Sequence, residues 1–159
     1  MYQRILERIQ GRGVLTVVDA TRDLLVKGLP YHPFLVKPNN YELGEIFGVK
    51  LSTREEVVPY GKKLQEMGAQ NVLISMAGEG AVLIAADGQS MGAPAPKGTL
   101  VNGVGAGDSM VAGFLTGWME KKDYVHAFHM GIAAGSASAF SENLATREEV
   151  LQVLQQVEQ

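Results

Sequence analysis

Short apolar runs rich in β-branched residues alternate with helix-forming stretches along most of this 159-residue chain. Such runs are typical of strands that are buried on both faces of a parallel sheet. The predicted strands are Val14–Asp19, Phe34–Lys37, Asn71–Met76 and Ala81–Ala86, followed by an Asp87-Gly88 hairpin turn and a return over Gln89–Ala93. The order predicts βαβ units, and so an α/β fold with helices layered on a parallel sheet.

Helix signals fill the stretches between and after these strands. The predicted helices cover Ile5–Ile9, Thr21–Gly28, Tyr41–Phe47, Ser52–Met67, about Asp108–Met119, Asp123–Phe140 and the segment after Thr146. Two capping boxes are expected, Ser52-Thr-Arg-Glu55 and Thr146-Arg-Glu-Glu149. No repeat or linker interrupts the pattern, so residues 1–159 are predicted to form one α/β unit.

Composition excludes several classes of protein. Apolar residues make up 46% and charged residues 19% of the chain, which is a globular balance, and the formal net charge of −3 argues against a general nucleic-acid binder. The absence of cysteine rules out disulfides and thiolate metal sites. No apolar run reaches the roughly 20 residues of a membrane-spanning helix, and the amphipathic N-terminus is unlike a secretory signal. We therefore expect a cytoplasmic protein without nucleic-acid or membrane partners.

The segment Leu100–Phe114 carries the clearest chemical signal. Gly105, Ala106, Gly107 and Asp108 stand where a loop is predicted to enter a helix. Small side chains leave the backbone amides bare there, and a helix N-terminus adds roughly half a positive charge. This combination suits a transferring phosphoryl group, with Asp108 in reach of an acceptor hydroxyl.

A short glycine motif alone is weak evidence, because it could equally be an ordinary turn with an acid in the first turn of a helix. The segment is not a Walker loop, since no Gly-Lys-Ser/Thr follows, and it lacks the strand-linked Gly-x-Gly-x-x-Gly of a dinucleotide fold. A dehydrogenase-type domain is therefore disfavoured.

Four segments in order strengthen the phosphoryl-transfer interpretation. Val101–Phe114 closely resembles the second signature of the ribokinase-like (PfkB) carbohydrate kinases, in the branch of 1-phosphofructokinases and tagatose-6-phosphate kinases. Val36–Leu43 is similar to the family's Asn-x-x-Glu segment, Ser75–Ala81 to its nucleotide loop, and Ala133–Phe140 to the helix on its adenine side. The resemblance covers nearly the whole chain, but only the C-terminal half of the family pattern.

The resemblance implies roles for individual residues. Asp108 would be the catalytic base, and the amides of Gly105, Ala106 and Gly107 would stabilise the phosphoryl charge. Asn39 and Glu42 would hold Mg²⁺, through water. The implied nucleotide contacts are Lys37, Asn39, Ser75, Gly78, Glu79, Gly80, Asn102, Gly135 and Ser138. ATP and Mg²⁺ are thus the expected cofactors, and the family also leaves room for a monovalent cation.

Simpler interpretations stay open for several of these side chains. Lys37 is as well explained as a solvated lysine at a strand end, and Asn39 with Glu42 as a helix cap. Asp19 ends a predicted parallel strand, where α/β sheets bind ligands, or it caps the next helix. The three histidines His32, His126 and His129 lack metal-ligand spacing and are expected to be surface or packing residues.

Members of the family are about twice as long as this chain, near the upper range of single domains. Their N-terminal half supplies sugar-binding residues and a β-sheet lid, so we expect the chain to be a fragment of the three-layer ribokinase-like fold. A sheet edge and an apolar surface left open would favour self-association.

The expected activity is transfer of phosphate from Mg·ATP to a phosphorylated ketose, most simply fructose 1-phosphate to fructose 1,6-bisphosphate. Tagatose 6-phosphate is the alternative acceptor. A nucleotide-binding fragment without catalytic activity is an alternative of a different class.

Overall fold

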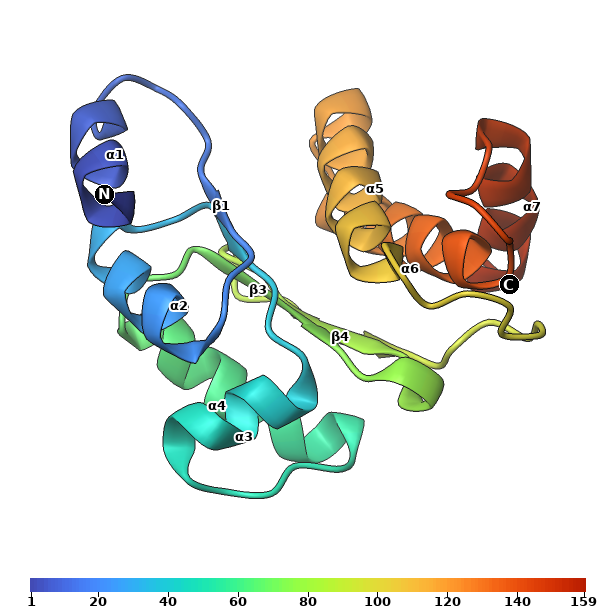
Figure 1. Cartoon of the computed structure of the whole chain (residues 1–159), viewed down its shortest axis with the longest axis horizontal. Helices are drawn as coiled ribbons and strands as arrows, with labels where there is room; N and C mark the ends of the chain where they lie inside the picture. The colour runs from blue at the N-terminus through green and yellow to red at the C-terminus, as the bar shows by residue number, and fades with distance from the viewer. The chain divides into compact units, whose positions relative to one another are not determined.

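The computed structural model describes residues 1–159, with the exception of the Tyr2 side chain. The chain divides into two compact units, Met1–Gly92 and Ala93–Gln159, each with its own set of elements (Figure 1). The first unit contains most of the sheet, and the second contains three long helices.

The sheet of the first unit has the strand order β1-β2-β3-β4-β5. Its strands are β1 (Val17–Val18), β2 (Leu35–Val36), β3 (Asn71–Ser75), β4 (Ala81–Ile84) and β5 (Ser90–Ala93), which ends at the first residue of the second unit. The pairs β1–β2 and β2–β3 are parallel, and β3–β4 is antiparallel with Leu73 opposite Leu83. The α/β class is confirmed. The sheet is mixed because the turn between β3 and β4 is too short for the crossover that a parallel pair needs.

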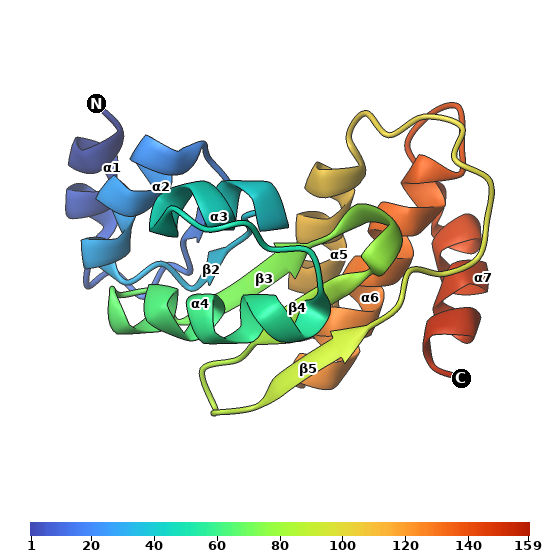
Figure 2. The same ribbon diagram turned by 90° about the horizontal axis from the view of Figure 1, so that it is seen from below.

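Helices of the first unit share one core with the sheet. They are α1 (Tyr2–Ile9), α2 (Arg22–Gly28), α3 (Asn40–Phe47) and α4 (Arg54–Glu66), with short 3-10 turns η1 (Leu29–Tyr31) and η2 (Ala77–Glu79). α4 packs across β3 and β4 (Figure 2). The shared core contains Val18, Leu25, Leu29, Val36, Leu43, Val57, Leu64, Val72, Ile74, Val82 and Ile84. Alternate residues of β3 and β4 point into this cluster, so α2, α3 and α4 cover one face of the sheet.

The capping box of α4 lies one residue later than predicted. The Thr53 hydroxyl accepts a hydrogen bond from Glu56 N, and Glu56 Oε1 accepts one from Thr53 N, so the predicted Ser52–Glu55 box is wrong. Both pairs have the required spacing, and the sequence alone does not choose between them. The predicted box at Thr146 and Glu149 is confirmed.

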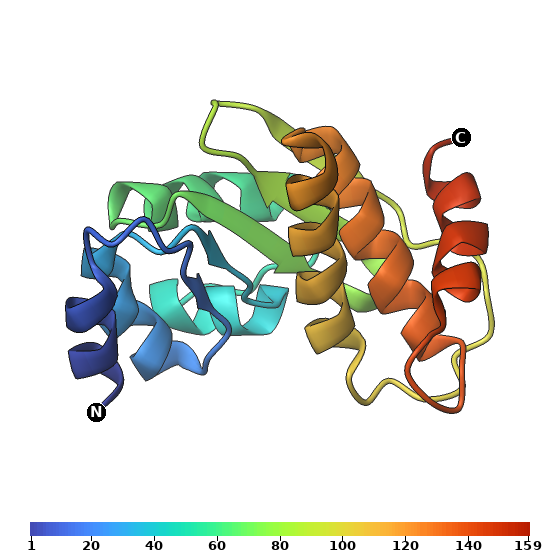
Figure 3. The same ribbon diagram turned by 90° about the horizontal axis from the view of Figure 1, so that it is seen from above.

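The second unit consists of α5 (Ala106–Lys121), α6 (Tyr124–Ala139) and α7 (Arg147–Val157). α6 packs against both α5 and α7 (Figure 3). Apolar side chains join α6 to α7, namely Met130, Ala133, Ala137, Val153 and Leu154. α5 begins two residues earlier than predicted and ends two residues later.

Four glycines allow α5 and α6 to approach closely. Gly113 and Gly117 on α5, and Gly131 and Gly135 on α6, are each spaced by one helical turn. A Cβ at Gly113 would lie 2.5 Å from Met130 O, and a Cβ at Gly117 would lie 2.9 Å from the Ala127 Cα. The helix axes can come this close only because these side chains are absent. Within the part of the chain that the structure describes, no helix is long and apolar enough to cross a membrane.

The first prediction concerns this close contact between α5 and α6, the helix seam. Gly113→Ala should lower the free energy of unfolding by about 1–3 kcal/mol, because the new Cβ would overlap α6. In an open helix the same change would stabilise by up to about 1 kcal/mol, so the sign is diagnostic. Chemical denaturation followed by circular dichroism measures it. Gly103→Ala is the control, since a Cβ there meets nothing within 4 Å; an unchanged Gly113→Ala midpoint would disprove the close contact.

The second prediction concerns the start of α7. The Ser141 hydroxyl, 2.5 Å from Glu149 Oε2, and then the Thr146 N–H and hydroxyl lower the pKa of Glu149 below its ordinary value of 4.5. A depressed carboxyl pKa gives stability that is present above pH 4.5 and is lost as the pH falls through the folded-state value. Glu149→Gln should therefore be less stable than wild type at pH 7 and lose this deficit as the pH falls through the folded-state pKa of Glu149. Glu148→Gln, in the same turn, is the control; a Glu149→Gln deficit independent of pH would contradict the argument.

Candidate functional site

Polar residues of the first unit gather at the carboxyl ends of its parallel strands. Asp19 follows β1, Lys37 and Asn39 follow β2, and Ser75 ends β3. Asn39 and Ser75 are paired by a parallel bridge, with Ser75 N donating to Pro38 O at 3.1 Å. Three residues that were predicted to contact nucleotide thus share the edge at which α/β sheets bind ligands.

Lys37 is a buried residue, not a solvated one. Its side chain is 9% exposed, and its Nζ lies 3.6 Å from Asp19 Oδ1. The interpretation as a solvated strand-end lysine is therefore wrong. Asp19 pairs with this ammonium, while Thr21 takes the N-cap position of α2. The pair fixes a positive charge at the carboxyl edge of the sheet.

Asn39 and Glu42 form the capping box of α3. Asn39 Oδ1 accepts from Glu42 N at 2.8 Å, and Glu42 Oε1 accepts from Asn39 N at 3.2 Å. The helix-cap interpretation is confirmed, and one oxygen of each side chain is engaged in it. Among the described residues, no group of three histidine, cysteine or acidic side chains could hold a metal ion. A metal role for this pair thus stays a prediction.

The predicted nucleotide loop follows β3 directly. Gly78 and Glu79 lie in η2, and Gly80 has a φ of 97°, a conformation that favours glycine. The loop closes through a hydrogen bond from Met76 N to Gly80 O at 2.9 Å. A Cβ at Gly78 would meet no atom within 4 Å. This backbone therefore lies open beside the end of β3, as a nucleotide loop requires.

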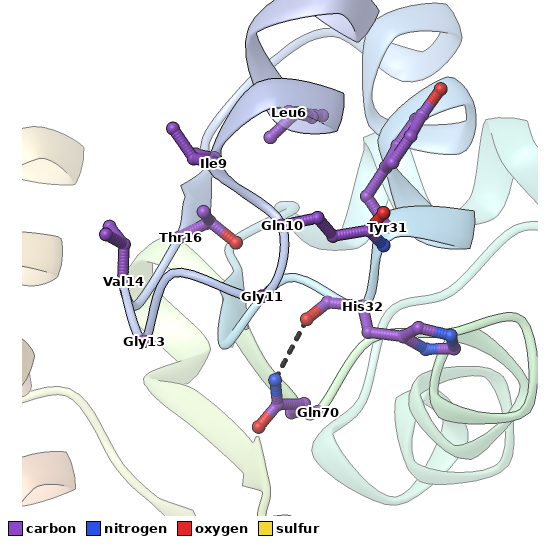
Figure 4. A pocket seen from close by; sticks show the side chains of 10 residues that line it. All are labelled: Leu6, Ile9, Gln10, Gly11, Gly13, Val14, Thr16, Tyr31, His32 and Gln70. Carbon is purple, nitrogen blue, oxygen red and sulfur yellow. Dashed lines mark hydrogen bonds between the residues drawn. The ribbon is translucent and has the colours of Figure 1, made fainter.

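A cavity of about 250 Å³ lies at the opposite, amino edge of these strands (Figure 4). Thr16, His32 and Gln70 line it just before β1, β2 and β3 respectively, and Gln70 Nε2 donates to His32 O at 2.9 Å. The other lining residues are Leu6, Ile9, Gln10, Gly11, Gly13, Val14 and Tyr31. None of the predicted site residues contributes to it, so it is distinct from the candidate site.

In the second unit, Gly105 caps α5 with a φ of 81°. Ala106, Gly107 and Asp108 form the first three positions of the helix, and Ser109 N makes the first bond back to Gly105 O at 2.9 Å. Backbone N–H groups at the first positions lack acceptors within a helix, although Ala106 N donates to Gly103 O in the preceding loop at 3.3 Å. The predicted anion hole is therefore at a real helix N-terminus, with an exposed Asp108 beside it.

The loop that leads into α5 is fastened to the end of α6. Val101 N and Asn102 N both donate to Ala139 O, at 2.9 and 3.1 Å. The Asn102 carboxamide donates to Glu142 O and accepts from Val104 N. Asn102 was predicted to contact nucleotide; in the structure its side chain holds the loop.

Gly135 and Ser138 lie on α6 beside the first turn of α5. A Cβ at Gly135 would lie 3.1 Å from Ala106 O. The Ser138 hydroxyl donates to Ser109 Oγ at 2.8 Å and accepts from Ala145 N at 3.1 Å. Ser109 was not among the predicted site residues, although it directly follows Asp108 in the segment that carried the resemblance. The predicted residues thus form two groups, one in each unit.

The chain matches the family described as pfkB family carbohydrate kinase over residues 1–150. It is 48% identical over 156 residues to a 1-phosphofructokinase of Bacillus subtilis. This alignment covers 98% of this chain and 51% of that protein. It is 33% identical over 159 residues to a D-tagatose-1-phosphate kinase of Bacillus licheniformis, covering 99% of this chain and 52% of that protein. The chain therefore spans about half the length of these curated relatives.

Solved structures agree with this assignment. The chain is similar to a crystal structure from Staphylococcus aureus whose protein is described as a candidate phosphofructokinase. The TM-score is 0.92 at 38% identity, over 98% of this chain and 50% of that one. Phosphofructokinase-2 of Escherichia coli, at 24% identity and a TM-score of 0.89, shares the fold over all of this chain and 53% of its own. The chain belongs to the pfkB family of carbohydrate kinases.

Proposed function

We propose that this chain supplies the nucleotide-binding and phosphoryl-transfer half of an ATP-dependent kinase for phosphorylated ketoses. The observation that carries the proposal is the glycine-capped N-terminus of α5 with Asp108 in its first turn. Fructose 1-phosphate is the proposed acceptor and fructose 1,6-bisphosphate the product, in keeping with the names of the Bacillus subtilis and other relatives.

The transfer makes a bond from the acceptor hydroxyl oxygen to the γ-phosphorus and breaks the bond between that phosphorus and the β,γ-bridging oxygen. The amides of the N-cap Gly105 and of the first helical residues Ala106 and Gly107 stabilise the charge that spreads over the phosphoryl oxygens. Ala106 N exchanges its 3.3 Å bond to Gly103 O for one to phosphate. Asp108 orients the acceptor hydroxyl and takes its proton. A carboxylate is a weak base, so in a loose transition state the proton leaves late and position matters more than basicity.

Lys37 serves as a phosphate contact in this proposal. Its ammonium is held at the carboxyl edge by Asp19, and a buried charge acts more strongly on a bound anion than a solvated one. Bound Mg²⁺ would neutralise phosphate charge. Glu42 fits this ion through water, because its capping bond uses one carboxylate oxygen and Mg²⁺ keeps several waters beside one or two carboxylates. A monovalent cation stays a prediction from the resemblance alone.

Two alternatives differ from this proposal in testable ways. The Bacillus licheniformis relative is named a D-tagatose-1-phosphate kinase, so a tagatose phosphate is the second candidate acceptor. A nucleotide-binding chain without catalytic activity is the other. Self-association through the open edge of β1 belongs with this alternative, since β1 is the terminal strand of the sheet and Val14 and Leu15 before it are exposed.

The third prediction tests the nucleotide half-site. The 159-residue chain should bind Mg·ADP saturably in a calorimeter, and Gly105→Val should weaken binding by at least about tenfold. The φ of 81° at Gly105 favours glycine, and a Cβ added there would lie 2.9 Å from Leu144 Cδ2. Gly103→Ala should bind as wild type does. If the folded wild-type chain binds no Mg·ADP, the half-site is not complete within this chain.

The fourth prediction tests catalysis. In a fusion that replaces the matching half of the Bacillus subtilis relative with this chain, Asp108→Asn should lower turnover of fructose 1-phosphate by about 100-fold or more. Mg·ADP affinity should hold or rise, because the change removes a negative charge near phosphate. Asp123→Asn is the matched control, since asparagine also caps a helix and Asp123 only caps α6. Full turnover in Asp108→Asn would assign the base elsewhere; a folded, nucleotide-binding but inactive wild-type fusion would favour the inactive alternative.

A further inference from the structure

One of the polar contacts of the first turn of α5 is made by a buried hydroxyl. Ser138, in the last turn of α6, is 3% exposed. It donates to Ser109 Oγ on α5 and accepts from Ala145 N in the loop before α7. Three separate segments of the second unit therefore meet at this one side chain.

A direct contact between Ser138 and nucleotide conflicts with these bonds. The Ser138 Oγ lies 2.8 Å from Ser109 Oγ, and it also accepts from Ala145 N, so both neighbours already engage this hydroxyl. A ligand that bound Ser138 would have to compete with these partners, and it would have to reach a residue that is almost fully covered. The role that the resemblance implied for Ser138 is thus hard to reconcile with its surroundings.

The same region of α6 contacts the loop that leads into α5 (the glycine loop, residues 101–105) and the first turn of α5 at two further points. Ala139 O accepts from both Val101 N and Asn102 N, and Gly135 lets the α6 backbone approach Ala106 O. Ser109, the partner of Ser138, follows Asp108 and makes the first backbone bond of α5. Rotation or displacement of this turn would move the amides of Gly105–Gly107 together with the Asp108 carboxylate.

We propose that Ser138 is a positioning residue, which acts through its hydrogen bond to Ser109 to fix the first turn of α5 and with it the phosphate-binding amides. The consequence of this inference for catalysis rests on the proposed function. The effect of the hydrogen bond on the position of the turn does not depend on that function. It places Ser138 behind the site rather than in it.

The fifth prediction compares Ser138→Ala, Ser109→Ala and the double variant in the 159-residue chain, at a temperature where each is folded by circular dichroism. Each single change should shift the amide NMR resonances of Gly105 and Gly107 and weaken Mg·ADP binding by about tenfold. Ser138→Ala also removes the acceptor of Ala145 N, so the double variant should be no worse than Ser138→Ala, which already lacks the bond to Ser109. Thr116→Val is the control: it deletes a hydroxyl of α5 that bonds only Ala112 O within the helix.

The outcomes separate this inference from the proposed function. If Ser138→Ala leaves the Gly105 and Gly107 resonances and the affinity unchanged, the inference is wrong. If Ser109→Ala leaves the two glycine resonances and the affinity unchanged, the bond from Ala145 N rather than the one to Ser109 is the cause, and the inference fails. It also fails if the effects of the two single changes add fully in the double variant. If the wild-type chain binds no Mg·ADP but both single variants shift the two glycine resonances alike, the positioning role is supported and the proposed nucleotide function of the chain is not.

Discussion

The close contact between α5 and α6 is the constraint on which the second unit depends. Glycines at Gly113, Gly117, Gly131 and Gly135 remove the side chains that would hold the two helices apart. Because the backbones nearly touch, the first turn of α5 lies against the last turns of α6, where a buried hydroxyl and a terminal carbonyl can reach it. The geometry of the anion hole therefore follows from helix packing as much as from its own glycine-rich sequence.

In the first unit, the corresponding constraint is the position of the Lys37 ammonium at the end of β2. The Lys37 side chain is long and flexible, and a free ammonium at a sheet edge would sample many positions. Burial of its stem and a single carboxylate partner, Asp19, restrict it. Since both residues follow parallel neighbours β1 and β2, the arrangement is a direct consequence of the strand order. Asn39, paired with Ser75 across the next ladder, adds the α3 N-terminus to the same edge.

Periodicity and capping signals predicted nearly every helix, because an amphipathic stripe and an N-terminal cap are local properties of the chain. What depended on contacts distant in sequence was less accessible. Ser52 and Thr53 each have a glutamate three residues later, so the sequence allowed two capping boxes. Only the structure shows that Thr53 and Glu56 form it. The short β3–β4 connection could have predicted their antiparallel pairing. The roles of Asn102 and Ser138 could not be read locally, because their partners, Glu142 and Ser109, lie up to 40 residues away.

The described contacts that hold the glycine loop all lie within residues 93–159. Ala139 O, the Asn102 carboxamide and the Ser138 hydroxyl belong to that unit, and so do the glycines of the helix seam. The helix N-terminus that we propose binds phosphate can therefore be formed by this part of the chain from its own interactions. Selection of the acceptor is a separate matter, since sugar specificity requires groups that recognise hydroxyls and a second phosphate, and the relatives devote about as much chain again to the rest of the enzyme. The helix N-terminus and the contacts that hold it are thus present in a chain that spans about half the length of these relatives, whereas the proposed choice of acceptor depends on other groups.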